Sequence, residues 1–247
     1  MKFPIRIVSR ARYEQMKYAK EALPLYNRLR ELQKSEQSSG GIIKSCALDV
    51  LKNAETFNIL DVGANCGAWS LAFLSFFPKA ISYAIEADPE TYKVLCKNTA
   101  SQTSIHPINA LLSSKVEKVI FYSHEISVIS SIYKPPSGLG KFQSVELVSN
   151  TLDGLISEQK INDVKLIKID AECHDLEVLK GGLNLMAQSS LKFVIVEFGI
   201  DPDNKWNIHI NTYIKFFGER GFVLNSMADW GLGYEPVQYG NALFFRS

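Results

Sequence analysis

The stretch "NILDVGANCGAWSLAF", residues 58–73, determines the fold that we expect for this chain. An apolar run ends at Asp61, Gly63 and Gly67 follow with small residues between them, and a helical pattern comes next. Glycines permit a tight turn with close backbone approach, and a helix N-terminus offers free N–H groups to a ligand. The stretch therefore predicts a buried strand, a glycine turn and a helix at a ligand site.

The spacing of the glycines disfavours a dinucleotide as that ligand. The dinucleotide fingerprint needs G-x-G-x-x-G, whereas this turn reads D-x-G-x-x-x-G, and the lysine and hydroxyl of a P-loop are absent. Glu86 ends the next predicted strand about 20 residues on, where an acid can accept hydrogen bonds from both ribose hydroxyls. This combination favours a nucleoside with a short charged tail, such as S-adenosylmethionine. The alternatives are a plain structural turn and a solvated strand end.

Length and composition indicate an ordinary globular protein. The 247 residues suit one domain, with or without a small accessory piece, and 46% are hydrophobic and 21% charged. A net charge of +1 gives no sign of a nucleic-acid or membrane partner. We find neither a leader-like N-terminus nor an apolar run long enough to span a bilayer, so we expect a cytoplasmic protein without a membrane span. The four scattered cysteines are interpreted as reduced thiols.

From about residue 57, predicted strands and helices alternate, which is typical of βαβ units in a parallel sheet covered on both faces. We therefore expect an α/β fold with a doubly wound, Rossmann-like sheet. The predicted strands span 57–62, 80–87, 104–112, 164–170, 192–198, 221–226 and 241–246, and the predicted helices span 68–77, 89–100, 152–159, 175–187 and 207–219.

Two parts of the chain depart from this alternation. Residues 1–55 are predicted to form an N-terminal helical extension, with helices within 10–36 and over 42–54, and 56–247 the main domain. Within that domain, 113–150 is a β-rich insertion, with expected strands at 117–124, 127–134 and 142–150 and a loop at 135–140. Because insertions at the edge of a ligand crevice commonly carry specificity, we expect this one to wall the acceptor pocket.

A second signature is "LIKIDAECHDLEVLKGG", residues 166–182, which puts acidic side chains at the carboxyl end of a strand. Ligands of open α/β sheets bind at that edge. His174 can serve there as a general base near neutral pH, or can simply cap the next helix or lie on the surface. Asp170 and Glu172 can orient a substrate or act as bases. A divalent cation needs more oxygen ligands than these two, so no metal is expected.

With these residues the chain resembles the FkbM-type S-adenosylmethionine-dependent methyltransferases. Their hallmark is a strand ending I-D-V-E-G-A-E before a helix with V-L-K-G, and this chain reads I-D-A-E-C-H-D and then "LEVLKG". The segments "LDVGANCGAWS", "EADPETYKVLCKN", "NTLDGLI" and "VIVEFG" agree in order, over roughly residues 57–200. The resemblance implies a class I methyltransferase fold that binds S-adenosylmethionine and methylates oxygen on sugars or secondary metabolites.

Carried over by position, the resemblance also implies site residues. It assigns cofactor binding to Asp61, Gly63, Ala64, Asn65, Gly67, Glu86, Asn109, Ala110 and Asp170, of which Glu86 would hold the ribose and Asn109 and Ala110 the adenine. The catalytic candidates are His174, Asp170 and Glu172, with His124 and Glu197 as weaker ones. The chain departs from the hallmark where Cys173 replaces glycine, His174 replaces alanine and Asp175 shortens a glutamate.

The function we expect is S-adenosylmethionine-dependent O-methylation of a small molecule or of a sugar or glycan hydroxyl. A cofactor-binding interaction module without turnover is one alternative, because the second signature is altered. A nicotinamide oxidoreductase is another, although the third glycine is missing. A nucleic-acid methyltransferase lacks support, since the chain has no Asn/Asp-Pro-Pro-Tyr motif and no basic tract. The sequence specifies neither the acceptor nor the oligomeric state.

Overall fold

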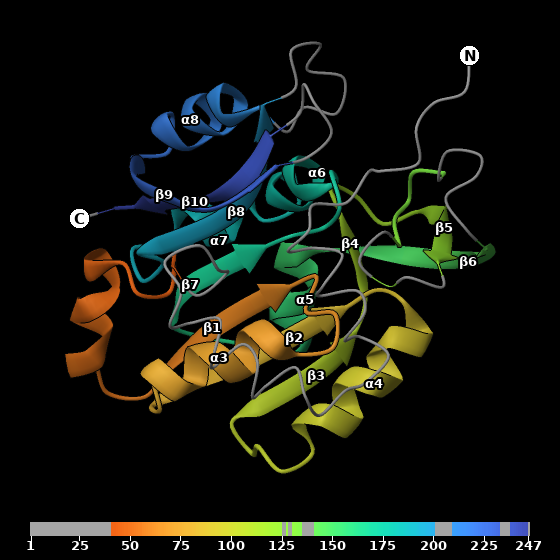
Figure 1. Ribbon diagram of the computed structural model, residues 1–247, viewed down its shortest axis with the longest axis horizontal. Helices are drawn as coiled ribbons and strands as arrows, with labels where there is room; N and C mark the ends of the chain where they lie inside the picture. The colour runs from red at the N-terminus through yellow and green to blue at the C-terminus, as the bar shows by residue number, and fades with distance from the viewer. Residues whose placement is uncertain are drawn as a thin grey trace.

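The computed structural model describes residues 41–124, 127, 130–134, 141–200, 209–232 and 238–246. These residues form a seven-stranded sheet in the order β3-β2-β1-β7-β8-β10-β9 (Figure 1). Its strands are β1 (Phe57–Val62), β2 (Ala80–Glu86), β3 (Ile105–Asn109), β7 (Val164–Ile169), β8 (Phe193–Ile200), β9 (Val223–Leu232) and β10 (Gln238–Phe245). All neighbours pair in parallel except β10, which is antiparallel to both β8 and β9. The expected α/β fold with a mostly parallel sheet is confirmed.

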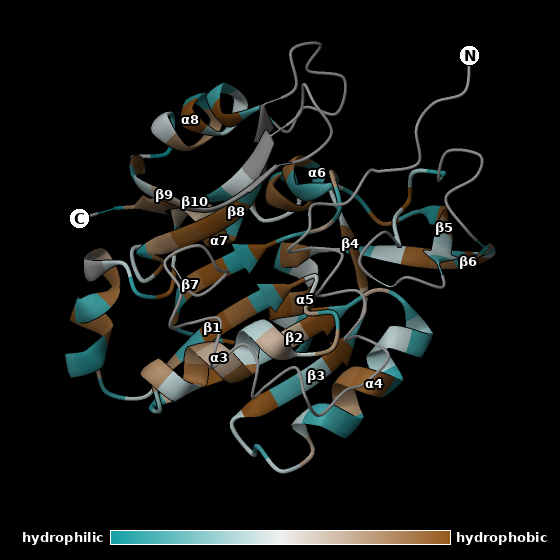
Figure 2. Cartoon of the chain, in the orientation of Figure 1, coloured by the Kyte–Doolittle hydropathy of each residue, from teal (hydrophilic) through white to brown (hydrophobic). Residues whose placement is uncertain are grey.

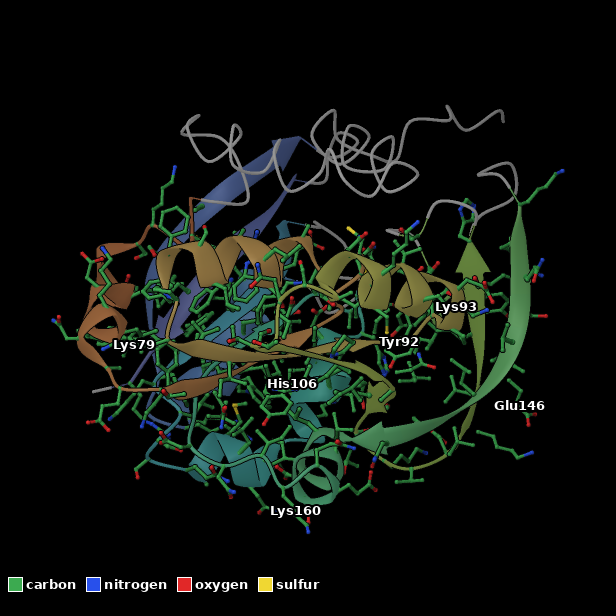
Figure 3. The ribbon with its side chains drawn as sticks, turned by 90° about the horizontal axis from the view of Figure 1, so that it is seen from below. Lys79, Tyr92, Lys93, His106, Glu146 and Lys160 are labelled. Carbon is green, nitrogen blue, oxygen red and sulfur yellow. The ribbon has the colours of Figure 1, made fainter. Side chains whose placement is uncertain are left out.

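Helices cover both faces of this sheet. Figure 3 shows α3 (Ala68–Phe76) and α4 (Pro89–Thr99) on one face, and α5 (Leu152–Glu158), α6 (Asp175–Lys180) and α7 (Leu183–Ala187) on the other. The 3-10 helix η1 (Cys46–Asn53) packs with α3, and α8 (Ile210–Gly218) packs with the α5–α7 side, in two separate hydrophobic clusters. The strands between the two clusters are largely apolar (Figure 2). Burial on both faces is why β1 and β7 are largely apolar along their whole length.

Two helix starts are formed by the side chains that precede them. Asp88 accepts hydrogen bonds from the N–H groups of Glu90 and Thr91, and Pro89 occupies the first turn of α4. The Thr151 hydroxyl accepts from the N–H of Gly154 at the start of α5.

The predicted helix over 175–187 is instead two helices, α6 and α7, divided at Gly181 and Gly182. A Cβ atom on Gly181 would lie 2.1 Å from the carbonyl oxygen of Ser113, so the backbone here packs directly against another strand. That strand is β4 (Leu111–Ser113), which also corrects the expected strand over 104–112. This range holds two strands, β3 and β4, which belong to different sheets.

Other boundaries also differ from the expectation. The helix expected over 42–54 is the shorter η1, and the final two strands are longer than expected. The helix expected from residue 207 begins at Ile210, and residues 201–208 lie outside the described residues. The helices expected within 10–36 also lie outside them.

The insertion contains a small second sheet of β4, β6 (Phe142–Thr151) and β5 (Lys118–His124), in that order. Figure 3 shows β6 curving away from the main sheet, with Glu146 on its outer part. Strand β4 pairs in parallel with the last residues of β6, from Leu111 beside Ser149 to Ser113 beside Thr151. The strand expected over 127–134 is wrong for the described residues of that range, which contribute one isolated bridge between Ser131 and Tyr122.

Candidate functional site

The glycine turn lies between the carboxyl ends of β2 and β7. Gly63 has a φ of +71°, and the N–H groups of Gly63 and Ala64 donate to the carbonyl oxygen of Ile85 at 3.0 and 2.9 Å. A Cβ atom on Gly63 would lie 1.9 Å from the carbonyl oxygen of Asp170. The turn therefore needs glycine for its conformation and for contact with the second signature.

The end of the turn packs against α4. Gly67 has a φ of +86° at the N-cap of α3, and a Cβ atom there would lie 2.8 Å from Leu95 and 2.9 Å from Thr99. Asn65 is also left-handed, with a φ of +50°. Its backbone N–H points to the end of β2, where it donates to Glu86.

Glu86 is a buried carboxylate beside this turn. Its Oε2 accepts from the N–H of Asn65 and its Oε1 from the N–H of Asp88, both at 2.8 Å. Burial raises the pKa of Glu86 to about 7, although the two backbone hydrogen bonds favour its charged form. Each carboxylate oxygen can accept a further hydrogen bond, so this side chain can receive two ligand hydroxyls.

Asn109 and Ala110 lie next to the exit of β2. The side-chain amide of Asn109 donates to the carbonyl oxygens of Glu86 and Ala87 at 2.8 and 3.2 Å. The backbone N–H of Ala110 donates to the carbonyl oxygen of Glu86 at 3.1 Å. Both residues hold the backbone that carries Glu86. Their contact with an adenine ring stays a prediction.

A buried ion group lies beneath the turn, and our sequence analysis missed its central residue, Lys168. The Nζ of Lys168 lies 3.2 Å from the carbonyl oxygen of Gly63, 3.4 Å from Oδ1 of Asp61 and 3.5 Å from Oδ2 of Asp170. Burial lowers the pKa of Lys168, but the carboxylates of Asp170 and Asp61 outweigh it and leave the pKa raised. Burial also raises the pKa of Asp61, against the opposing effect of Lys168. A lysine inside a buried apolar strand was the signal, since such a charge needs a partner.

The loop after β7 is conformationally strained. Glu172 and Cys173 have φ values of +51° and +73°, which side chains other than glycine rarely adopt. Asp175 is buried and accepts from the N–H of Ala171 at 3.0 Å, and burial raises its pKa to about 6. Asp170 begins this loop and lies against Gly63 of the glycine turn, and the other two catalytic candidates, Glu172 and His174, follow it within four residues.

His174 is buried between α6 and β4. Its Nε2 lies 3.1 Å from the hydroxyl of Ser113, and its Nδ1 has no hydrogen-bond partner within the part of the chain that the structure describes. Burial lowers the pKa of the ring below its usual value. His174 occupies the N-cap position of α6 without a side-chain capping bond. A capping role therefore does not account for this side chain.

The insertion contacts both loops of the candidate site. The Ser127 hydroxyl donates to Oδ1 of Asn65 at 3.2 Å, and the Ser131 hydroxyl donates to the carbonyl oxygen of Glu172 at 3.1 Å. The ring of Tyr133 meets that of His174 edge-on, with centroids 6.3 Å apart. These contacts put Ser127, Ser131 and Tyr133 at the carboxyl edge of the main sheet.

The weaker candidates, His124 and Glu197, belong to β5 and β8. His124 is buried at the end of β5, where its N–H donates to the hydroxyl of Ser130. Glu197 lies in β8, opposite Asn241 of β10.

Among the described residues, no group of three or more His, Cys, Asp or Glu side chains is arranged to hold a metal ion. No helix in the same residues is long and apolar enough to cross a membrane.

The donor set fits S-adenosylmethionine. A buried carboxylate at the end of β2, hydrogen-bonded to the glycine turn, suits a pair of ribose hydroxyls. In the strand order, the antiparallel β10 lies between β8 and β9. This order, together with a glycine turn after β1 and an acid at the end of β2, defines the class I methyltransferases. The chain belongs to the methyltransferase FkbM domain family, which it matches over residues 61–224. S-adenosylmethionine is the cofactor of that family, so the nicotinamide alternative is set aside.

Comparison with individual proteins gives one curated relative and several structures. The chain is 31% identical over 157 residues to the hexuronic acid methyltransferase AglP of Haloferax volcanii, covering 62% of each chain. The precorrin-6y C5,15-methyltransferase of Geobacter metallireducens has a TM-score of 0.48 at 12% identity, over 87% of this chain and 91% of that one. M. capricolum TrmK with S-adenosyl-homocysteine has a TM-score of 0.46 at 11% identity, over 83% of this chain and 70% of that one.

Proposed function

We propose that this protein transfers a methyl group from S-adenosylmethionine to a hydroxyl group of a sugar, a glycan or another small molecule. The observation that carries the proposal is the contact between Gly63 and Asp170, because it brings a nucleoside-binding turn against a loop of acids and a histidine. The name of the relative AglP, a hexuronic acid methyltransferase, supports a sugar acceptor. Family membership supports methyl transfer as the reaction.

The cofactor side of the proposed site is formed by β1, β2 and the turns that follow them. S-adenosylmethionine supplies an activated methyl group when bound. Glu86 would accept the ribose hydroxyls, and the turn from Gly63 through Asn65 to Gly67, with Ala64, would lie against the rest of the nucleoside. Asp61 would support this turn from beneath, and Asn109 and Ala110 would border the base.

The acceptor side is formed by the loop after β7 and by the insertion. Asp170 and Glu172 would orient the acceptor, and the alignment of the reacting groups accounts for much of the rate in such a reaction. His174 would remove the proton of the attacking hydroxyl at Nδ1, because its lowered pKa keeps the ring neutral near pH 7. Ser127, Ser131 and Tyr133 of the insertion would wall the pocket.

The experiment that tests this proposal offers the protein a methyl-labelled donor and a panel of acceptors. The panel contains hexuronic acids, neutral hexoses and oligosaccharides, and the label is traced by mass spectrometry. Treating the product with mild base separates the two possible linkages, since a methyl ester on a uronic carboxylate is cleaved and an ether on a hydroxyl survives. A base-stable product is expected.

The outcome that contradicts hydroxyl methylation is a product cleaved by base. If no acceptor is labelled while calorimetry detects binding of S-adenosylhomocysteine, the protein is a cofactor-binding module without turnover on these acceptors. The altered I-D-A-E-C-H-D signature is the feature that keeps this second function in consideration.

A further inference from the structure

Lys168 joins two strands and two loops at one buried point. It lies directly beside Asp61 in the register of β1 and β7, and its side chain is 7% exposed. Its ammonium group contacts the carbonyl oxygen of Gly63 in the glycine turn and the carboxylate of Asp170 in the loop after β7. One cation is therefore shared by the turn on the cofactor side and the loop on the acceptor side.

The polar contacts continue on the far side of Asp61. Its Oδ2 accepts from the hydroxyl of Ser70 at 2.6 Å, and that hydroxyl lies 2.7 Å from the hydroxyl of Ser82. These three side chains are completely buried. A continuous series of polar contacts thus runs from β2 through α3 and β1 to Lys168 and Asp170.

A buried ammonium group cannot drift away from its partners without a large cost. Leaving a charge buried and unpaired is strongly destabilising, so Lys168 keeps its carbonyl and carboxylate neighbours in place. A Cβ atom on Gly63 would overlap the backbone of Asp170, so the two loops also touch directly.

We propose that Lys168 is a positioning residue that ties the Gly63 carbonyl to the Asp170 carboxylate, so that the cofactor turn and the acceptor loop order as one unit. The proposal rests on the proposed function, because it assigns the turn to the donor and the loop to the acceptor. It goes beyond that function by coupling the two: an occupied cofactor turn stiffens the loop that orients the acceptor.

Hydrogen exchange on the protein with and without S-adenosylhomocysteine, and without any acceptor, tests this coupling. Amides in 61–67 and 86–88 are expected to exchange more slowly with the ligand, and so are amides in 170–175. At a ligand concentration of 100 times Kd, openings that release the ligand slow by up to about 100-fold. The dissociation constant of each variant is measured by calorimetry so that all are compared at equal saturation.

Substitution separates transmission through Lys168 from direct contact of the loop with the ligand. In Lys168→Met, protection of 61–67 and 86–88 is expected to remain while that of 170–175 is lost. Lys165→Met is the matched control: it lies on the same strand and removes a surface ion pair to Asp163, so it should keep the wild-type pattern. If Lys168→Met does not fold, Asp170→Asn removes the outer contact at a side chain that is 31% exposed, and the same loss is expected.

Three results overturn the proposal, and they separate a failure of the coupling from a failure of the cofactor site. Protection in 170–175 that persists in a folded Lys168→Met, or in Asp170→Asn when only that variant folds, shows that Lys168 transmits nothing. The same conclusion follows if ligand protects only 61–67 and 86–88 in the wild-type protein. An absence of protection in all three segments instead contradicts the cofactor site itself, and with it both this proposal and the proposed function.

Discussion

The backbone N–H of Asn65 donates a hydrogen bond to Oε2 of Glu86, with 2.8 Å between the two atoms. Asn65 belongs to the turn after β1 and Glu86 ends β2, so the bond joins the first two strand ends of the nucleotide-binding half. Asn65 itself has a left-handed backbone, with a φ of +50°. The shape of the turn and the place of the acid are therefore fixed together.

Cofactor affinity is expected to depend on the ionisation of Glu86. Burial raises its pKa to about 7, so part of the population is protonated at neutral pH and accepts hydroxyls poorly. Affinity for S-adenosylhomocysteine should rise by up to about tenfold between pH 6 and 8, measured by calorimetry. Glu86→Gln should abolish this rise, and Glu86→Ala should weaken binding by about 1.5–3 kcal/mol. Equal affinity across this range in the wild-type protein would remove Glu86 from the site.

The raised pKa of Glu86 also has a consequence for stability. The folded state holds its proton to higher pH than the unfolded chain does, so this group's contribution is present at low pH. It is lost as pH rises from about 4.3, the unfolded value, through about 7.

Comparing alanine substitutions at Gly63 and Gly221 is expected to separate the cost of a positive φ from the cost of a steric collision of the new Cβ atom. Gly63 and Gly221 both have positive φ values, +71° and +77°, but a Cβ atom on Gly221 meets only Arg246 at 3.7 Å. Gly221→Ala should therefore cost only the left-handed strain, about 1–2 kcal/mol. Gly63→Ala should cost more, because its Cβ atom collides with Asp170, and should also weaken cofactor binding. Equal losses in the free energy of unfolding would show that the collision is relieved cheaply.

Cys173→Gly is expected to stabilise the protein. Cysteine is strained at a φ of +73°, by about 1–2 kcal/mol, whereas the extra entropy of an unfolded glycine costs about 0.5–1 kcal/mol. The net gain in the free energy of unfolding should be up to about 1 kcal/mol by denaturant titration. Lys160→Gly, at a φ of +54°, is a matched control away from the site and should gain by a similar amount. A destabilised Cys173→Gly with a stabilised Lys160→Gly would mean that the thiol makes a necessary contact.

His174→Asn tests the proposed base. Single-turnover methyl transfer by the wild-type protein should fall as pH drops below an apparent pKa lower than about 6.5, because burial disfavours the charged ring. The variant should lose this dependence and slow by about 100-fold, with cofactor affinity within a few-fold of wild type. The lowered pKa also means that this group destabilises the wild-type fold as pH falls below about 6.5, a loss absent in the variant. A wild-type rate in His174→Asn would leave Asp170 and Glu172 as the candidate bases.

Tyr133→Ala tests whether the insertion walls the acceptor pocket. The ring of Tyr133 meets His174, so its removal should raise KM for the acceptor by about tenfold and leave the Kd of S-adenosylhomocysteine within about twofold. Tyr122→Ala is the control, because that ring packs instead against Phe142 within the small sheet. A change in cofactor affinity without a change in the KM for the acceptor would place Tyr133 at the cofactor and not in the wall of the acceptor pocket.

The parts of the fold that sequence could predict are those that depend on local pattern. The run into Asp61, the glycine turn and the Asp88 cap each follow from residues next to one another, and all are found where the pattern predicts them. The contact of Gly181 with the carbonyl oxygen of Ser113 could not be predicted, because Ser113 lies nearly 70 residues earlier in the chain. The same holds for residues 127–134, whose alternation resembles a strand but whose pairing depends on distant partners.

The candidate site shows the same division. Glu86 was identified from its spacing to the glycine turn, whereas the hydroxyls of Ser127 and Ser131 gave no local signal, since serines are common in any loop. Lys168 could have been found: an ammonium group within a run of Val, Leu and Ile must have a buried partner, and Asp61 stands in the neighbouring apolar run. The contact of Lys168 with Asp170 could not be predicted from the sequence, because it depends on how the loop after β7 turns.

The pairing of β4 with the end of β6 has an evolutionary consequence. Leu111 lies beside Ser149 and Ser113 beside Thr151, so the chain leaves for the insertion and returns from it at neighbouring points. A segment of different length or shape with the same two ends can replace it without moving the strands that carry Glu86 and Asp170. The insertion, which we propose as the wall of the acceptor pocket, can thus be exchanged at two adjacent joints. On that proposal, new acceptors are acquired by recombination there while the strands that carry Glu86 and Asp170 stay unchanged.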